Sequence, residues 1–379
     1  MAIKPTFLRL YIVFTYYQLR VVLAHRRGYP PHGRCVLVYH LSLKPSAEHL
    51  AGFDELIEFD AVPGIVDSRN HKAFGLIGGR IEQILNMQSQ ALPDAETAEL
   101  VVCSAGYPVI NWLIVKFHRR MTVNILADGL SAYLPLRKPV IRLATDLLRK
   151  LYLRLGYGVS ARYFYRHPHG LDSDMIGALY GELPEFLSTH KKPVFKLPQV
   201  FASVVGAPAA AASRDVWFLG QPHTGRSDSA LHTLLTQLLA ALRADHPQAR
   251  RFIYKRHHFE HRASAETLRA IGFEVEASRV CAEELLAAAS PLAVYSYRST
   301  ALMSLRRTLP AGVPVVSFAP WLIKPPDERL VEGSIAQWML RLGVDRPKQG
   351  SAIFQLEAGL RSSRAEQTDL PSPAQWPLS

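Results

Sequence analysis

The 379-residue sequence contains few cysteines and no long apolar run. Its three cysteines, Cys35, Cys103 and Cys281, are far apart, which excludes a disulfide-stabilised scaffold and any CxxC metal motif and suits a reducing compartment. No apolar stretch approaches the roughly 20 residues that span a bilayer. The stretch Phe7–Phe14 is short, contains Arg9, and is not followed by a small-residue cleavage site. We expect a soluble cytoplasmic protein, or one attached peripherally to the inner face of the cytoplasmic membrane.

Three common nucleotide-binding and catalytic fingerprints are also missing. GxGxxG and GxxxxGK[ST] do not occur, which argues against dinucleotide and P-loop chemistry. The pair Gly78-Gly79 is not followed by Lys and Ser or Thr. No GxSxG nucleophile elbow is present, which argues against an α/β-hydrolase.

Basic side chains are in excess. The chain has 44 Lys+Arg against 32 Asp+Glu, a net charge of +12. Residues 1–200 carry 24 basic and 16 acidic groups (+8), and residues 201–379 carry 20 and 16 (+4). Hydrophobic residues make up 48%, so the chain as a whole is not disordered. The charge suits an anionic partner such as an acidic glycan, a lipid headgroup or a nucleic acid.

Short β-rich runs, among them 35–39, 122–126 and 251–254, alternate with helical stretches on both sides of a linker-like segment, Ala207–Ser213. This pattern predicts two Rossmann-like α/β domains that face each other across a cleft. We place an acceptor-side domain at 1–200, a nucleotide-binding domain at 201–360, and a disordered polar tail at 361–379. A long basic amphipathic helix is expected at Pro139–Leu155, either as a solvated face or as a patch for membrane or polyanion.

Four clusters of polar residues follow predicted strands, and ligands of open α/β sheets bind at the carboxyl ends of strands. The first is Ala127-Asp128-Gly129. A carboxylate placed after a buried strand can project into a cleft, where desolvation raises its pKa toward that of a general base. An ordinary Asp-Gly turn is the alternative.

The second cluster is Lys255-Arg256-His257-His258, with His261 and Arg262 close behind. Cationic groups and an imidazole at a strand end suit a phosphate or a leaving-group oxygen. A basic surface loop is the alternative. Zinc binding would need His257 and His261 on a helix and a further Cys or Glu ligand that is not obvious, so we expect no metal.

Two further clusters complete the set. Ser299 and Thr300 begin a predicted helix, where hydroxyls and free N–H groups can bind an anion or simply cap the helix. In Phe218-Leu-Gly-Gln-Pro222, Gly220 allows close approach to the backbone and is followed by Gln221.

Taken in this order, the segments resemble the bacterial sialyltransferases of glycosyltransferase family 52 and the related capsular polysialyltransferases. Those families carry an acidic-acidic-Gly motif, then Lys-x-His-Pro, then Ser-Ser/Thr. The matches are Ala127-Asp128-Gly129, Lys255–His258 and Ser299-Thr300, and Phe14–Leu19 is similar to their Thr-Pro-x-Gln-Leu start. Phe218–Pro222 resembles the start of their second domain, and the resemblance covers roughly residues 8–320.

The resemblance implies a glycosyltransferase B fold and inverting, metal-independent transfer of sialic acid from CMP-sialic acid to a hydroxyl of a lipooligosaccharide, capsule or other surface glycan, with no cofactor. It implies the following roles: Asp128 as base, His257 as acid or phosphate partner, Lys255, Ser299 and Thr300 as phosphate ligands, and Gly129, Gly220 and Gln221 as substrate-binding residues. Two positions depart from the motifs. Ala127 replaces the first acidic residue, so Asp128 or another carboxylate is the base, and His258 replaces the proline.

Two other functions are kept open. The same fold serves transferases that use another nucleotide sugar. A basic non-catalytic protein that binds polyanions or membrane would also have this charge, although no nucleic-acid recognition motif stands out.

Overall fold

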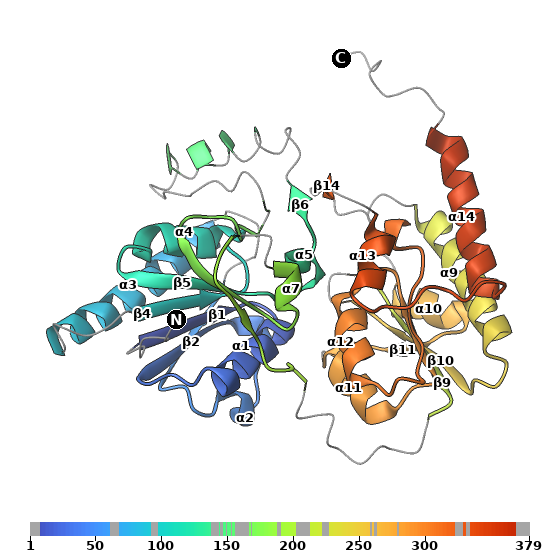
Figure 1. Cartoon of the computed structure of the whole chain (residues 1–379), viewed down its shortest axis with the longest axis horizontal. Coiled ribbons are helices and arrows are strands. Elements are labelled where there is room, and N and C mark those ends of the chain that lie inside the picture. Colours follow the sequence, from blue (N-terminus) through green and yellow to red (C-terminus); the bar gives the residue numbers. More distant parts are fainter. Residues whose placement is uncertain are drawn as a thin grey trace. The chain divides into compact units, whose positions relative to one another are not determined.

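The computed structural model divides the chain into two compact units (Figure 1). Unit 1 comprises Met1–Ala202 and Pro326–Glu332, and unit 2 comprises Ser203–Pro325 and Gly333–Ser379. The segment 326–332 belongs to unit 1, whereas the prediction of a single boundary at 200/201 assigned it to the second domain. The structure describes residues 8–60, 68–91, 98–137, 144, 147–148, 150–152, 154–155, 167, 169–187, 191–201, 213–221, 227–257, 260, 264–278, 280–322, 329–330 and 334–368.

Unit 1 is built on a parallel sheet with the strand order β3-β2-β1-β4-β5-β7-β8. The central strand β1 is buried at every position, as expected for an apolar run covered by helices on both faces. A short antiparallel pair, β6 with β14, lies outside this sheet. The strands are β1 (Leu8–Val13), β2 (Arg34–His40), β3 (Glu55–Phe59), β4 (Ala98–Val102), β5 (Met121–Leu126), β6 (Leu136–Arg137), β7 (Ile176–Gly181), β8 (Val194–Lys196) and β14 (Arg329–Leu330).

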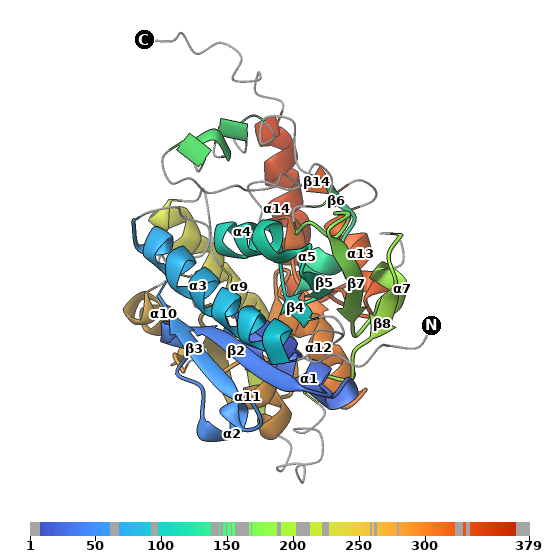
Figure 2. The same ribbon diagram turned by 90° about the vertical axis from the view of Figure 1, so that its left-hand side faces the viewer.

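Helices cover both faces of this sheet. Figures 1 and 2 show α3 and α4 together on one face and α1 on the other. Gly78 permits the close approach of α3 and α4, because a Cβ there would lie 2.9 Å from Cζ3 of Trp112. The helices are α1 (Tyr16–Gly28), α2 (Ala47–Leu50), α3 (Ser68–Ala91), α4 (Pro108–Phe117), α5 (Leu130–Tyr133) and α7 (Pro184–Leu187).

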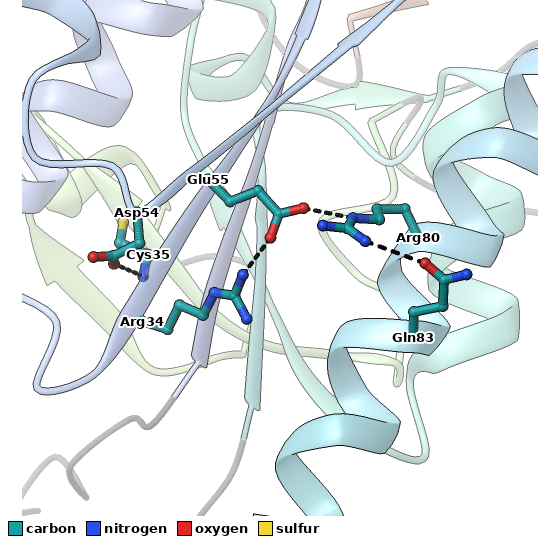
Figure 3. Close-up of polar contacts among 6 residues, drawn as sticks. All are labelled: Arg34, Cys35, Asp54, Glu55, Arg80 and Gln83. Atoms are coloured by element: carbon teal, nitrogen blue, oxygen red, sulfur yellow. Dashed lines mark hydrogen bonds and ion pairs between the residues drawn. The ribbon is translucent and has the colours of Figure 1, made fainter.

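The edge of the unit 1 sheet at β3 is tied to its neighbours by ionic contacts (Figure 3). Glu55 of β3 accepts hydrogen bonds from Arg34 of β2 and from Nε of Arg80 on α3, the latter at 2.6 Å. Oδ2 of Asp54 accepts from the backbone N–H of Cys35 at 2.6 Å. These contacts add to the packing of Ile57 and Phe59, whose burial on one face of the strand specifies its register.

Unit 2 contains a second parallel sheet, with the order β11-β10-β9-β12-β13. Both sheets therefore have the Rossmann order, in which the first strand lies between the second and the fourth. The elements are β9 (Asp215–Leu219), α9 (Asp228–Asp245), β10 (Arg251–Lys255), α10 (Ala265–Ile271), β11 (Glu274–Glu276), α11 (Ala282–Ala289), β12 (Ala293–Ser296), α12 (Thr300–Thr308), β13 (Val315–Ser317), α13 (Ile335–Arg341) and α14 (Ala352–Thr368). The prediction of two Rossmann-like α/β domains is confirmed.

The expected disordered tail is wrong for the residues that the structure describes. Helix α14 continues through 361 to Thr368, and 369–379 lie outside the described residues. The helix packs on α9, with Ile353 fully buried in the unit 2 core. The carboxylate of Asp245 accepts from the first N–H groups of α14, those of Ala352 at 2.6 Å and Ile353 at 3.0 Å. Polar composition suggested disorder because the apolar residues that anchor the helix, Ile353, Leu356 and Leu360, all precede position 361.

Candidate active site

The acidic group of the first cluster lies at the carboxyl end of β5. The N–H of Ala127 donates to the carbonyl of Tyr180 at 2.7 Å and extends the pairing with β7, and the Ala127 side chain is buried. An unpaired carboxylate at position 127 would be costly in that setting. Asp128, half-buried, is therefore the acidic residue of the motif at this edge.

Gln18 holds the carboxylate of Asp128. Thr15 caps α1 and accepts from the N–H of Gln18 at 3.2 Å. The side-chain Oε1 of Gln18 accepts from the N–H of Phe14 at 2.8 Å, so its Nε2 must face the other way. That Nε2 donates to Oδ2 of Asp128 at 2.7 Å. The Phe14–Leu19 segment thus connects directly to Asp128, a contact that the sequence alone did not assign.

Burial raises the pKa of Asp128 to about 6, although the hydrogen bond from Gln18 and a backbone hydrogen bond act in the opposite direction. The pKa values of two neighbouring side chains, Tyr107 and Cys103, are also raised. Burial, and next the charge of Asp128, raise the pKa of the Tyr107 hydroxyl and that of the Cys103 thiol. A carboxyl group with a pKa near 6 is ionised at neutral pH and still accepts a proton readily, which is the requirement for a general base.

These groups surround the topological switch point of the unit 1 sheet. The chain leaves β1 and β4, which are neighbours, in opposite directions, and ligands of such sheets bind in the crevice between the two. Gln18 follows β1, Tyr107 follows β4, and Asp128 follows β5, the next strand. Gly129 has an extended backbone (φ −172°) and caps α5.

In unit 2 the predicted residues follow three adjacent strands, β10, β9 and β12. Gly220 and Gln221 follow β9, and the N–H of Gly220 donates to the carbonyl of Lys255 at 2.9 Å. His257 follows β10, and Ser299 and Thr300 follow β12. The structure therefore brings these residues to one edge of the unit 2 sheet, again around a switch point. Asp128 and Gly129 lie on the edge of the other unit, and the cleft between the units stays a prediction.

Packing within unit 2 leaves no room for a side chain at Gly220. A Cβ at this position would lie 2.8 Å from the hydroxyl of Tyr254 and closer still to the carboxylate of Glu260. The prediction that Gly220 admits a ligand is untested, and the packing already explains the absence of a side chain.

Glu260 is a buried carboxyl group that the sequence analysis missed. Its Oε1 accepts from the hydroxyl of Tyr254 at 2.7 Å, and its Oε2 accepts from the N–H of His257 at 3.2 Å. Burial raises its pKa to about 7, opposed first by the Tyr254 hydrogen bond. Glu260 thus fixes the backbone at His257. Nothing in the spacing marks it, because the contact depends on a loop conformation.

Lys255 is the last residue of β10 and is buried. Its Nζ donates to the carbonyl of Ser278, and burial lowers its pKa. Binding a phosphate would require this hydrogen bond to be exchanged for one to the ligand. A phosphate role for Lys255 stays a prediction.

Ser299 and Thr300 lie at the start of α12. Ser299 is the N-cap, and its Oγ accepts from the N–H of Ala301 at 3.2 Å. Thr300 is the first helical residue, and both side chains are half-buried. The capping role is therefore present, and anion binding by the same hydroxyls stays a prediction.

Within the described residues, no three His, Cys, Asp or Glu side chains form a group that could hold a metal ion. His258, His261 and Arg262 of the second cluster, and Pro222 of the fourth, lie outside the described residues.

The fold and its two polar sheet edges define a protein with two Rossmann-like α/β domains. No protein-family model matches the sequence. No curated protein matches it either.

Several solved structures are distantly similar. One is described as a UDP-N-acetylglucosamine 2-epimerase from Listeria monocytogenes (12% identity, 98% of this chain and 99% of that one, TM-score 0.49). Another is an α/β-galactoside α-2,3-sialyltransferase from Photobacterium phosphoreum (10%, 94% and 96%, TM-score 0.48). A third is the UDP-GlcNAc 2-epimerase of Methanocaldococcus jannaschii (7%, 98% and 95%, TM-score 0.46). These similarities are weak, so the function is inferred from this chain's own residues.

Proposed function

We propose that the protein is a glycosyltransferase that moves sialic acid from CMP-sialic acid to a hydroxyl of a glycan or glycolipid, with inversion and without a metal. The observation that carries the proposal is the carboxyl group of Asp128, held by Gln18 at a topological switch point with its pKa raised to about 6. The order of the sequence motifs supports the choice of donor.

In this mechanism Asp128 accepts the proton of the acceptor hydroxyl. The acceptor oxygen then forms a bond to the anomeric carbon of sialic acid. The bond from that carbon to the phosphate oxygen of CMP breaks, and its electron pair stays on the phosphate. Attack from the face opposite the leaving group inverts the anomeric configuration.

The departing phosphate is assigned to unit 2. His257 donates a proton or a hydrogen bond to it, and the hydroxyls of Ser299 and Thr300 donate further hydrogen bonds. The N–H groups at the start of α12 add to the positive potential there. Glu260 supports this arrangement because it fixes the backbone of His257. Gln221, which is almost fully buried at the same edge, is assigned to the nucleotide side.

The decisive experiment measures CMP release from CMP-sialic acid with lactose-terminated and sialylated acceptors. Asp128→Asn and His257→Ala are each expected to lower turnover by about 10²–10⁴-fold, the usual contribution of a general acid or base. Asp60→Asn, at the same sheet edge, and His232→Ala, exposed on α9, are the matched controls and should keep full activity.

A calorimetric panel of CMP, UMP and UDP separates the alternatives. Saturable binding with preference for CMP is expected. Preference for UDP would indicate a transferase of the same fold that uses a different nucleotide sugar as donor. No nucleotide binding, or full turnover in Asp128→Asn, would overturn the proposal.

A further inference from the structure

Exposed apolar side chains gather in one segment of unit 1. Residues 144, 147, 148, 150–152, 154 and 155 are helical. Four leucines among them are strongly exposed: Leu147 (60%), Leu148 (68%), Leu151 (53%) and Leu155 (76%). We call these four side chains the leucine face. Elsewhere in the described residues, no single element has more than two exposed large hydrophobic side chains.

The leucine face is a continuous stripe. At about 100° per residue, the four positions fall within an arc of about 100° on a helix. Single exposed leucines are common on protein surfaces, whereas a contiguous stripe marks a surface that binds something.

Charge indicates what that partner is. Lys150 and Arg154 are exposed and lie along one side of the leucine face. Tyr152, which is 54% exposed, borders the other side. The sequence adds Arg142 and Arg149 to the same stretch, against the single acidic residue Asp146. An apolar stripe with basic groups along one side and a tyrosine on the other is the pattern of a helix in the interface of an anionic bilayer. The leucines would lie at the acyl boundary, and the ammonium and guanidinium groups at the lipid phosphates.

We propose that the leucine face docks unit 1 on the surface of a membrane rich in anionic phospholipid. The contact would be peripheral. None of the helices in the described part of the chain is long and apolar enough to cross a bilayer. Peripheral attachment to a membrane was expected from the sequence, and the leucine face is the surface that would make this contact. This inference does not depend on the transferase activity.

Co-sedimentation of the full chain with vesicles tests it. Vesicles of equal parts phosphatidylglycerol and phosphatidylcholine should bind the protein at least tenfold better than phosphatidylcholine alone. The double variant Leu151→Glu with Leu155→Glu should lose at least tenfold in affinity for the anionic vesicles. In the double variant Lys150→Glu with Arg154→Glu, affinity for the anionic vesicles should fall by about fivefold for each basic group. Its affinity for vesicles of phosphatidylcholine alone should not change.

The matched control is Leu76→Glu on α3, a leucine of similar exposure (59%) outside the segment. It should bind vesicles as the wild type does. The proposal is overturned by a wild type that stays in the supernatant, or by a leucine-face variant that binds unchanged. It is also overturned if sedimentation velocity shows a dimer that the leucine-face variant disrupts without any vesicle binding, because the face would then belong to a second copy.

Discussion

At Asp128, burial and hydrogen bonding act on the carboxyl group in opposite directions. Burial favours the protonated form, whereas the amide of Gln18 donates to the carboxylate and favours the ionised form. Burial prevails, and the pKa rises to about 6. A charged carboxylate at this edge therefore lowers the stability of unit 1 at neutral pH, which is the usual cost of a functional group.

Asp128→Asn should for that reason stabilise the protein at neutral pH. The folded pKa (about 6) lies above the ordinary value of 3.8, so the stability that Asp128 contributes is lost as pH rises between about 4 and 6, and the Asp128 contribution is constant above that range. We expect a gain of about 1–2 kcal/mol for the variant at pH 8, reduced from the full shift because the group is only half-buried. At pH 3.5 the gain should vanish. Urea unfolding at both pH values measures it, and an equal gain at both would contradict the assigned pKa.

Gln18→Glu tests the hydrogen bond itself. The Oε1 that accepts from Phe14 is kept, but the donor to Asp128 becomes a second carboxylate. Because like charges resist joint ionisation, the proton-binding step of the pair should move up by about one pH unit or more. The acid limb of the pH–rate profile, expected near pH 6 in the wild type, should move with it. ¹³C NMR titration of the aspartate carboxyl groups measures the same pKa shift independently of enzyme activity. If neither the titration nor the acid limb of the pH–rate profile moved, a positioning role for Gln18 would be excluded.

The candidate site was only partly predictable at this scale. Asp128 and Ser299 follow apolar runs whose carboxyl ends must meet at a sheet edge, so their placement follows from the alternation of strands and helices. Gln18 and Glu260 act through contacts whose partners are set by loop and helix geometry, which local sequence does not encode. Lys255 has the expected position, but its side chain turns to Ser278.

At the scale of elements, glycine has opposite effects in two places. Gly220 follows β9 under the side chains of Tyr254 and Glu260, so Gly220→Ala should cost about 1–3 kcal/mol of stability through overpacking. Gly79 lies on the exposed side of α3 with open space around its Cα. Gly79→Ala should add about 0.5–1 kcal/mol through helix propensity. Chemical denaturation of both variants checks the signs, and a Gly220→Ala protein as stable as the wild type would contradict the packing.

Helix α14 offers a second matched pair. Ile353 is fully buried against α9, and the next residue, Phe354, is 40% exposed. Ile353→Ala should cost about 2–5 kcal/mol, the range for deleting a buried aliphatic side chain. Phe354→Ala should cost less than about 1 kcal/mol. Thermal unfolding compares them, and equal losses would mean that α14 does not pack as described.

Strands were the elements best anticipated from sequence. The β-rich runs at 35–39, 122–126 and 251–254 all lie in strands, because most of their residues are apolar, as is usual in buried parallel strands. The strands β7 and β8 were not singled out. β3 escaped notice because Glu55 and Glu58 interrupt its apolar pattern, although Glu55 is balanced by two arginines. The basic helix expected at Pro139–Leu155 is partly described, and every described residue from 144 to 155 in it is helical.

At the scale of the whole molecule, the charge of +12 attracts any polyanion, so nucleotide binding must be separated from general attraction. Binding of heparin should fall by orders of magnitude as salt rises from about 50 to about 200 mM, because many counterions are released. CMP binding, which engages few charges, should weaken by less than about tenfold over the same range. Isothermal titration at both salt concentrations compares the two ligands, and parallel losses would favour a non-catalytic polyanion binder.

The boundary between the units was predicted at 200/201, shortly before the linker-like segment Ala207–Ser213 after which the alternation restarts. The first segment of unit 1 ends at Ala202. The return of 326–332 was not predictable, since β14 contributes only two residues, Arg329 and Leu330, to its pairing with β6. Such a short pairing has no periodicity to detect.

The late position of α14 has a consequence for synthesis on the ribosome. Its N-terminal N–H groups are capped by Asp245, 107 residues earlier, and Ile353 fills the core formed by α9 and its sheet. The second unit therefore emerges with an incomplete interior and stays exposed to chaperones and proteases until α14 is translated.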